Sequence, residues 1–136
     1  MIFVDTGAFL ARYLANDQYH AQAVSTWAMI ERNKELFCTS NFVIDELATL
    51  LARRSSYFFA AQKIHSLYES EIIDILRPGE TEELKATTLL AKYSDQEVSF
   101  TDCTSFVLMK SRGIHRVFSF DRHFDLPGFT RIPLLL

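Results

Sequence analysis

The residues with the clearest chemical potential are four acids, each placed at or beyond an apolar segment of the chain. Three aspartates follow apolar runs that have the character of buried strands, and a glutamate lies in a helical segment that follows another such run. The four are Asp5, Glu46, Asp102 and Asp121. Carboxylates that gather without Cys or His are typical ligands of Mg²⁺ or Mn²⁺. The sequence therefore predicts a metal site, provided that the fold brings the four acids together.

Taken singly, each aspartate has an ordinary structural explanation. Asp5 could cap the helix that follows it, and Asp102 could lie in the first turn of a helix, where a negative charge interacts well with the helix dipole. Asp121 could be a turn-forming residue. The metal-site hypothesis depends on the joint pattern.

Glu46 is harder to explain without a cation. Phe42, Val43 and Leu50 lie one helical turn from it, which places its carboxylate on the apolar stripe of the helix. A buried carboxylate requires a cation, a hydrogen-bonding partner or a proton, and pairing with Arg or Lys is the alternative to metal. Asp45 points about 100° away and is expected to face solvent or to support the site.

Strands and helices are predicted to alternate along the chain. Strands are expected at residues 1–4, 36–38, 71–76, 98–100 and 116–120, with a weak edge strand at 130–135, and helices at 8–15, 20–32, 42–54, 57–70, 80–93 and 103–112. This order indicates right-handed crossovers and an α/β fold, with a parallel sheet of about four to five strands and helices on both faces. Ligands bind beyond the carboxyl ends of such strands, where the acids are expected.

Size and composition indicate one globular domain over residues 1–136. The apolar fraction is 49% and the charged fraction 23%, which excludes disordered and fibrous classes. No apolar run approaches the ~18 residues of a membrane span, so we expect a cytoplasmic protein with no membrane partner. Cys38 and Cys103 lack the spacing of a zinc site and are expected to be reduced thiols.

Several motifs resemble those of PIN domains, in particular the VapC toxins of toxin–antitoxin pairs. These motifs are Phe-Val-Asp-Thr at the start, Asp-Glu-Leu in the third helix, Val-Ser-Phe-Thr-Asp-Cys, and Phe-Ser-Phe-Asp-Arg-His-Phe. The resemblance covers essentially the whole chain. It implies an endoribonuclease that depends on Mg²⁺ or Mn²⁺, with RNA as substrate and an antitoxin protein as partner. We also expect a homodimer.

The resemblance also assigns roles to individual residues. It carries the acidic site onto Asp5, Glu46, Asp102 and Asp121, all of which match. It implies supporting roles near the metal for Thr6, Thr101 and Asp125. The expected reaction is attack of an activated water on a phosphodiester, which leaves a 5′-phosphate and a 3′-hydroxyl.

The net charge of −3 does not exclude an RNA substrate. If the four acids bind metal, the remaining balance is 14 minus 13, about +1. Cations that could hold the RNA backbone, or could instead be solvated surface charges, are Arg53, Arg54, Lys110 and Arg122. Arg112 and Arg116 are weaker candidates, because they lie at the wrong ends of their predicted elements.

Other functions were weighed against these residues. A haloacid-dehalogenase-like phosphatase needs a second Asp two residues after the first, where this chain has Gly7, and a response-regulator receiver needs an Asp where the strand at 71–76 ends on Arg77. A non-catalytic PIN-like module that binds RNA or protein remains open, because its ligands would be the same carboxylates. Tyr57-Phe58-Phe59 cannot all face inward on one helix, so at least one ring should lie near the surface. The hypothesis for such a ring is a dimer seam or a groove for an antitoxin segment, and the alternative is crowding against an adjoining helix.

Overall fold

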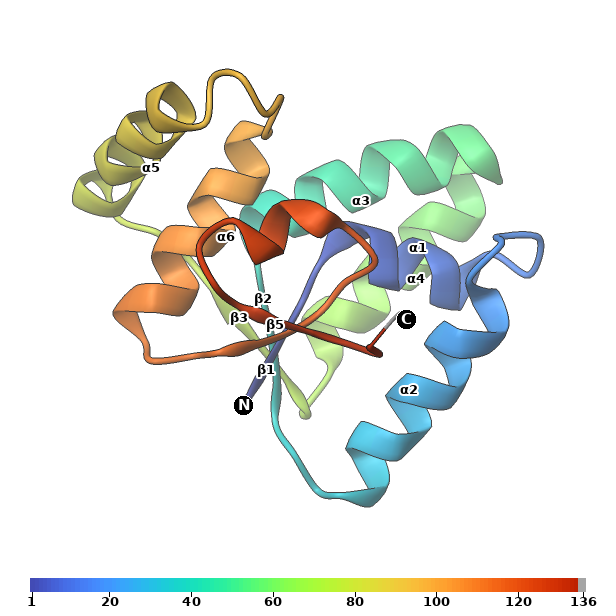
Figure 1. Cartoon of the computed structure of the whole chain (residues 1–136). Helices are drawn as coiled ribbons and strands as arrows, with labels where there is room; N and C mark the ends of the chain where they lie inside the picture. The colour runs from blue at the N-terminus through green and yellow to red at the C-terminus, as the bar shows by residue number, and fades with distance from the viewer. Residues whose placement is uncertain (135–136) are drawn as a thin grey trace.

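The computed structural model describes residues 1–134 (Figure 1). In chain order the elements are β1 (Ile2–Val4), α1 (Thr6–Tyr13), α2 (His20–Arg32), β2 (Phe37–Ser40), α3 (Asn41–Arg54), α4 (Tyr57–Glu69), β3 (Ile73–Leu76), α5 (Glu80–Lys92), α6 (Phe100–Ser111), β4 (Arg116–Phe118), the 3₁₀ turn η1 (Arg122–Asp125) and β5 (Thr130–Ile132). Consecutive pairs of helices connect β1 to β2, β2 to β3 and β3 to β4. Within residues 1–134, no helix is both long and apolar enough to cross a membrane.

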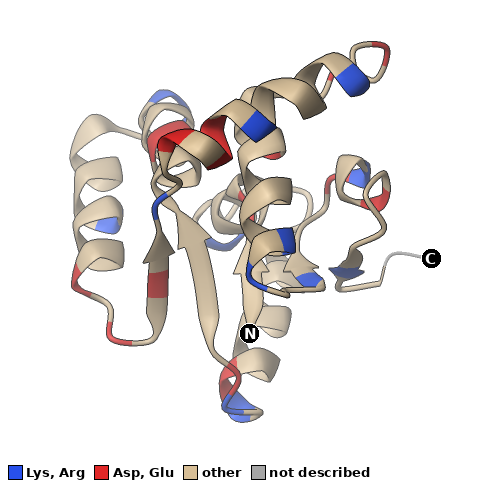
Figure 2. Cartoon of the chain, turned by 90° about the vertical axis from the view of Figure 1, so that its left-hand side faces the viewer, with Lys and Arg blue, Asp and Glu red and all other residues tan. Residues whose placement is uncertain are grey.

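The strands form one parallel sheet in the order β3-β2-β1-β4-β5. β1 is central, and its Phe3 lies opposite Cys38 of β2 and Val117 of β4. Ile2, Phe3 and Val4 are all fully buried, although neighbouring side chains on a strand point to opposite faces. The sheet is therefore covered on both faces at its centre, and Figure 2 shows helices on either side of the strands. The predicted α/β architecture is confirmed.

Aromatic side chains join the helices to this sheet. Trp27 of α2 stacks on Phe37 of β2 at 4.1 Å between ring centroids, and Phe106 of α6 meets Phe124 of η1 edge to face at 5.1 Å. The second contact matters for the site, because it fixes the turn at residues 122–125 against α6.

The triplet at the start of α4 divides between the core and the surface. Tyr57 and Phe58 are 79% and 75% exposed, whereas Phe59 packs against the core. The prediction that at least one of these rings lies at the surface is confirmed. Their proposed role in binding a partner stays a prediction.

The predicted strand at residues 98–100 is wrong. The Ser99 side chain accepts a hydrogen bond from the backbone N–H of Asp102 at 3.0 Å, so Ser99 is the N-cap of α6 and the helix begins at Phe100. Asp102 therefore lies in the first turn of a helix, not at the end of a strand. The change of chain direction before Asp102 thus comes from the N-cap of α6, and not from the end of a strand.

Element ends differ elsewhere by a few residues. α1 begins at Thr6 instead of Ala8, directly after Asp5, and β4 ends at Phe118 instead of Phe120. The weak last strand covers Thr130–Ile132 and is an edge strand, as Pro133 suggested. Residue 135, included in that prediction, lies outside the described residues.

Candidate active site

Asp5 occupies the carboxyl end of the central strand. Its backbone N–H donates to the carbonyl of Phe118 at 3.1 Å, which continues the pairing of β1 with β4 and fixes the residue at the sheet edge. The carboxylate is only 4% exposed, and its Oδ2 accepts a hydrogen bond from the Ser119 hydroxyl at 2.9 Å. The strand thus delivers a buried acid in a set orientation.

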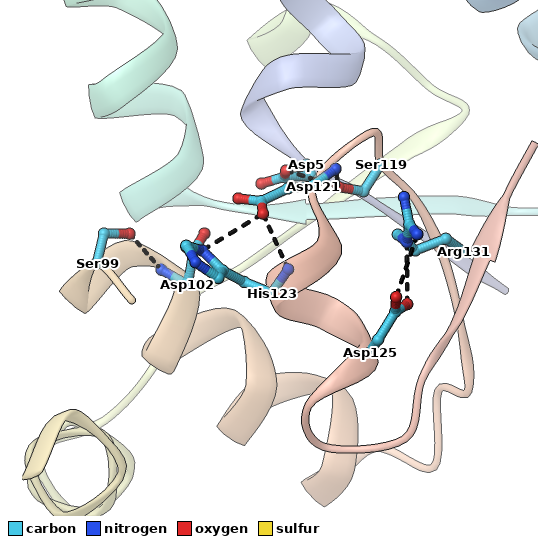
Figure 3. Close-up of polar contacts among 8 residues, drawn as sticks. All are labelled: Asp5, Ser99, Asp102, Ser119, Asp121, His123, Asp125 and Arg131. Atoms are coloured by element: carbon cyan, nitrogen blue, oxygen red, sulfur yellow. Dashed lines mark hydrogen bonds and ion pairs between the residues drawn. The ribbon is translucent and has the colours of Figure 1, made fainter. Parts of the chain in front are cut away.

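Ser119 connects this acid to a second one. The Ser119 hydroxyl oxygen also accepts from the backbone N–H of Asp121 at 3.0 Å, while Oδ1 of Asp121 accepts from the backbone N–H of His123 at 2.9 Å. Asp121 therefore begins η1 and is held beside Asp5. Figure 3 shows Asp5, Ser119 and Asp121 together, with Asp102 and His123 next to them.

All four predicted acids line one open cleft of about 720 Å³. Asp102 is 7% exposed, whereas Glu46 and Asp121 are half-buried. Glu46 is thus less buried than its position on an apolar stripe suggested, because the stripe ends at the cleft. Asp45 is exposed, as expected for a neighbour that points about 100° away from Glu46.

The acidic cleft (the cleft lined by Asp5, Glu46, Asp102 and Asp121) raises the pKa of its two most buried carboxyl groups, those of Asp5 and Asp102. Burial, and then the charge of Asp102, raises the pKa of Asp5 to about 8, although the Ser119 hydrogen bond opposes the shift. Burial, and then the charges of Asp121 and Glu46, raises the pKa of Asp102 to about 6. The cleft therefore favours a bound proton or a bound cation over four free negative charges.

The side chains present in the cleft fit a hard dication. Besides the carboxylates, Thr6 lines the cleft, and its buried Oγ1 has no hydrogen-bond partner within residues 1–134. A buried hydroxyl without a partner is costly, so an unpaired oxygen here is consistent with a ligand or a ligated water. The donor set is dominated by oxygen, which is what Mg²⁺ and Mn²⁺ prefer.

The other two proposed supporting residues lie differently. The Thr101 carbonyl accepts from the Thr104 and Ser105 hydroxyls inside α6, and Thr101 is not among the residues that line the cleft. The Asp125 carboxylate accepts two hydrogen bonds from Arg131, at 2.9 and 3.1 Å. Figure 3 shows this pair to one side of the other acids.

Some cleft residues were missed by sequence reasoning. His123 places its Nδ1 at 3.4 Å from Oδ2 of Asp102 and 3.3 Å from Oδ1 of Asp121, and Ser119 joins two acids as described above. Tyr19 and Phe120 stack at 4.4 Å between centroids, where both line the cleft. The sequence signal that could have identified His123 is its position two residues after Asp121 in a predicted turn, because this spacing can place both side chains at one site.

The cationic candidates separate into two groups. Arg54 and Arg122 line the acidic cleft, whereas Arg53 borders a groove between α3 and α4 and Lys110 borders another beside α5 and α6. The weaker candidates are engaged elsewhere, as their positions suggested: Arg112 pairs with Glu82 and Arg116 with Glu35. Figure 2 shows Lys and Arg spread over the chain.

Known proteins share both the sequence pattern and the fold. The PIN domain family matches residues 2–129. The 23S rRNA-specific endonuclease VapC20 of Mycobacterium tuberculosis, from strains CDC 1551 / Oshkosh and ATCC 25618 / H37Rv, is 33% identical over 132 residues, which are 97% of this chain and 98% of the relative.

Two solved structures extend the comparison. The crystal structure of Mycobacterium tuberculosis VapC20, described as a toxin that cleaves the sarcin-ricin loop, matches with a TM-score of 0.87 and 31% identity, over 96% of this chain and 97% of that one. DNA-bound VapBC from Salmonella typhimurium matches with a TM-score of 0.66 and 12% identity over the same shares, and so shows the fold alone. The predicted resemblance is confirmed, and this chain belongs to the PIN domain family.

Proposed function

We propose that this protein is an endoribonuclease that requires a divalent cation and acts as the toxin of a toxin–antitoxin pair. The observation that carries the proposal is the convergence of two buried acids, Asp5 and Asp102, with Glu46 and Asp121 in one open cleft. The 33% identity to an rRNA endonuclease supports RNA as the substrate.

Each acid has a distinct place in the proposed reaction. Asp5 and Asp102 are the most buried and would be the principal ligands of Mg²⁺ or Mn²⁺, and Glu46 and Asp121 would complete the site or orient water. A divalent cation in this site supplies charge that lowers the pKa of water and stabilises the negative charge that develops on a phosphodiester. Ser119 would hold Asp5 and Asp121 in position through its two hydrogen bonds.

Arg54 and Arg122 would hold the RNA backbone at the same cleft. Both line it, and a guanidinium can donate two hydrogen bonds to one phosphate. Arg53 and Lys110 border other grooves, so any contact that they make with RNA would lie outside the catalytic cleft.

Incubation of the purified protein with total RNA tests the proposal. With Mg²⁺ or Mn²⁺ we expect discrete fragments that carry 5′-phosphates and 3′-hydroxyls, and with EDTA we expect intact RNA. Retarded but uncut RNA in every condition would instead support the non-catalytic binding module. Fragments that form equally in EDTA would refute the role of the metal.

The antitoxin and the homodimer are separate proposals about partners. Tyr57 and Phe58 expose large aromatic surface at the start of α4, and Tyr57 borders the groove between α3 and α4. Such surface suits an apolar partner segment. Co-expression with the product of the adjacent gene should yield a stable complex that a Tyr57→Ser, Phe58→Ser variant weakens; a monomer that captures no neighbour-encoded protein would contradict both proposals.

A further inference from the structure

His123 lies where a cation ligand would lie, although sequence reasoning assigned the metal to carboxylates alone. Its Nδ1, one oxygen of Asp102 and one oxygen of Asp121 all lie within 4.8 Å of one another. The nitrogen is 3.4 Å from Oδ2 of Asp102 and 3.3 Å from Oδ1 of Asp121. Neighbouring ligands of one octahedral ion with 2.1 Å bonds are about 3 Å apart, so these separations suit a shared ion.

The contacts of Nδ1 do not have the form of hydrogen bonds. The atom is buried, yet it has no hydrogen-bond partner within the part of the chain that the structure describes, despite two carboxylates within 3.4 Å. Donor atoms that share an ion point toward that ion, and not toward one another. The two separations fit a common ligand sphere as well as they fit the ion pairs that a protonated imidazole would make.

The position of the imidazole is fixed by the fold. Oδ1 of Asp121 accepts from the backbone N–H of His123 at 2.9 Å, which fixes the backbone of His123 beside Asp121. The next residue, Phe124, is fully buried and packs at 5.1 Å on Phe106 of α6, the helix that carries Asp102. Asp102 and His123 therefore lie on two elements, α6 and η1, that pack against each other, and such packing holds ligands in position before a metal binds.

An independent feature is consistent with a polar ligand in the cleft. Thr6 is 3% exposed, lines the same cleft and leaves its Oγ1 without a hydrogen-bond partner within residues 1–134. An unpaired buried hydroxyl beside four acids needs something polar to complete it.

We propose that Nδ1 of His123 is a direct ligand of the dication in the acidic cleft, and that this nitrogen makes the site favour Mn²⁺ over Mg²⁺. Imidazole binds transition metals in preference to Mg²⁺, which selects oxygen and water. The inference rests on the proposed metal site. It adds that the site is a mixed nitrogen and oxygen site, with His123 as a residue that determines metal specificity.

Pulsed electron paramagnetic resonance of the Mn²⁺ complex of the full chain tests this directly. Mn²⁺ bound to the wild-type protein should show ¹⁴N modulation from a coordinated imidazole, and labelling the histidines with ¹⁵N should replace it with the ¹⁵N pattern. His123→Asp, which offers an oxygen in place of the nitrogen, should abolish the modulation. His115→Asp is the matched control, because His115 is exposed, and it should retain the modulation.

Calorimetric titration of the same proteins with Mn²⁺ and Mg²⁺ tests the specificity. His123→Asp should lower the ratio of the Mn²⁺ affinity to the Mg²⁺ affinity roughly tenfold. This is the lower limit of the roughly 10- to 100-fold losses of metal affinity that follow mutation of residues that support metal ligands. Wild-type protein that binds Mn²⁺ without ¹⁴N coupling, or coupling that persists in His123→Asp, would overturn the inference. The wild-type spectrum decides the question even if the variant fails to fold.

These readouts do not depend on RNA cleavage. Nitrogen-coupled Mn²⁺ in a protein that does not cut RNA would refute the proposed function and leave the ligand assignment intact. Metal-dependent cleavage without nitrogen coupling would refute the ligand assignment alone.

Discussion

Replacement of Asp5 by Asn should stabilise the metal-free protein while it removes activity. The pKa of Asp5 is raised from 3.8 to about 8, chiefly by burial and then by the charge of Asp102. Because the folded-state pKa lies above the unfolded value, the folded state binds the proton more tightly. The contribution of this group to stability is therefore fully present below about pH 4 and is lost as the pH rises toward 8.

The size of the effect follows from those two values. Between pH 3.8 and pH 7 the folded protein keeps a proton that the unfolded chain has released, at about 1.4 kcal/mol per pH unit, or about 4 kcal/mol in all. Asn is neutral in both states and avoids this cost. Asp5→Asn should therefore be more stable than wild type by up to about 4 kcal/mol at pH 7, and the two should converge near pH 4.

Urea unfolding in EDTA, between pH 4 and pH 8, measures this difference. Asp45→Asn is a matched control, because Asp45 is exposed and does not line the acidic cleft, and the stability of this variant should follow that of wild type. Added Mg²⁺ or Mn²⁺ should stabilise wild type and leave Asp5→Asn unchanged. An Asp5→Asn protein less stable than wild type at pH 7, or a wild-type protein that gains stability from pH 5 to pH 8 in EDTA, would refute the reasoning.

Three further outcomes are expected. Ser119→Ala removes the hydrogen bonds to Asp5 and to the backbone of residue 121, and should weaken Mn²⁺ binding in calorimetry by roughly 10- to 100-fold; unchanged affinity would show that the hydroxyl does not orient the site. Arg122→Gln should reduce the slope of log binding constant against log salt concentration by about 0.7 for single-stranded RNA, because one phosphate contact is lost. Arg53→Gln, outside the cleft, should leave this slope unchanged. Equal slopes for both variants would contradict the placement of Arg122 at the RNA-binding cleft. Burial raises the pKa of the Cys38 thiol to about 12, so this thiol should not react with a disulfide reagent until the protein unfolds, and rapid reaction of the native protein would contradict its burial.

The position of Asp5, at the end of a strand of the sheet, is the part of the site that the sequence predicts. Asp5 directly follows three fully buried residues of the central strand, and such a run fixes both the strand and its end. Family motifs predict Asp102 beside the other acids, and it does line their cleft, but the local sequence pattern predicts a strand end where the structure has the first turn of α6. The helix begins after Ser99 because the Ser99 hydroxyl oxygen accepts one hydrogen bond from a backbone N–H. The residues at 98–100 are apolar enough to resemble a short strand, so the sequence pattern does not reveal this cap.

The remaining features depend on contacts between distant segments. Ser119 and Asp5 are 114 positions apart, and their hydrogen bond arises only when β4 pairs with β1. His123 reaches Asp102 only because Phe124 packs on α6. Likewise, the distance of Lys110 from the acidic cleft follows from the length of α6, at whose far end it lies. The sequence shows the type of each side chain, but tertiary packing determines which side chains lie at the acidic cleft.

We propose that a cation held by the buried acids makes this cleft a ribonuclease. The most direct test of this proposal is RNA cleavage as a function of added Mg²⁺ or Mn²⁺, from EDTA upward, by wild type, Asp102→Asn and the exposed control Asp45→Asn, with folding of each checked by circular dichroism. We predict cleavage that rises with cation concentration in wild type and Asp45→Asn and stays at background in Asp102→Asn. Cleavage by folded Asp102→Asn at the wild-type rate, or wild-type cleavage that is independent of the cation, would contradict the account.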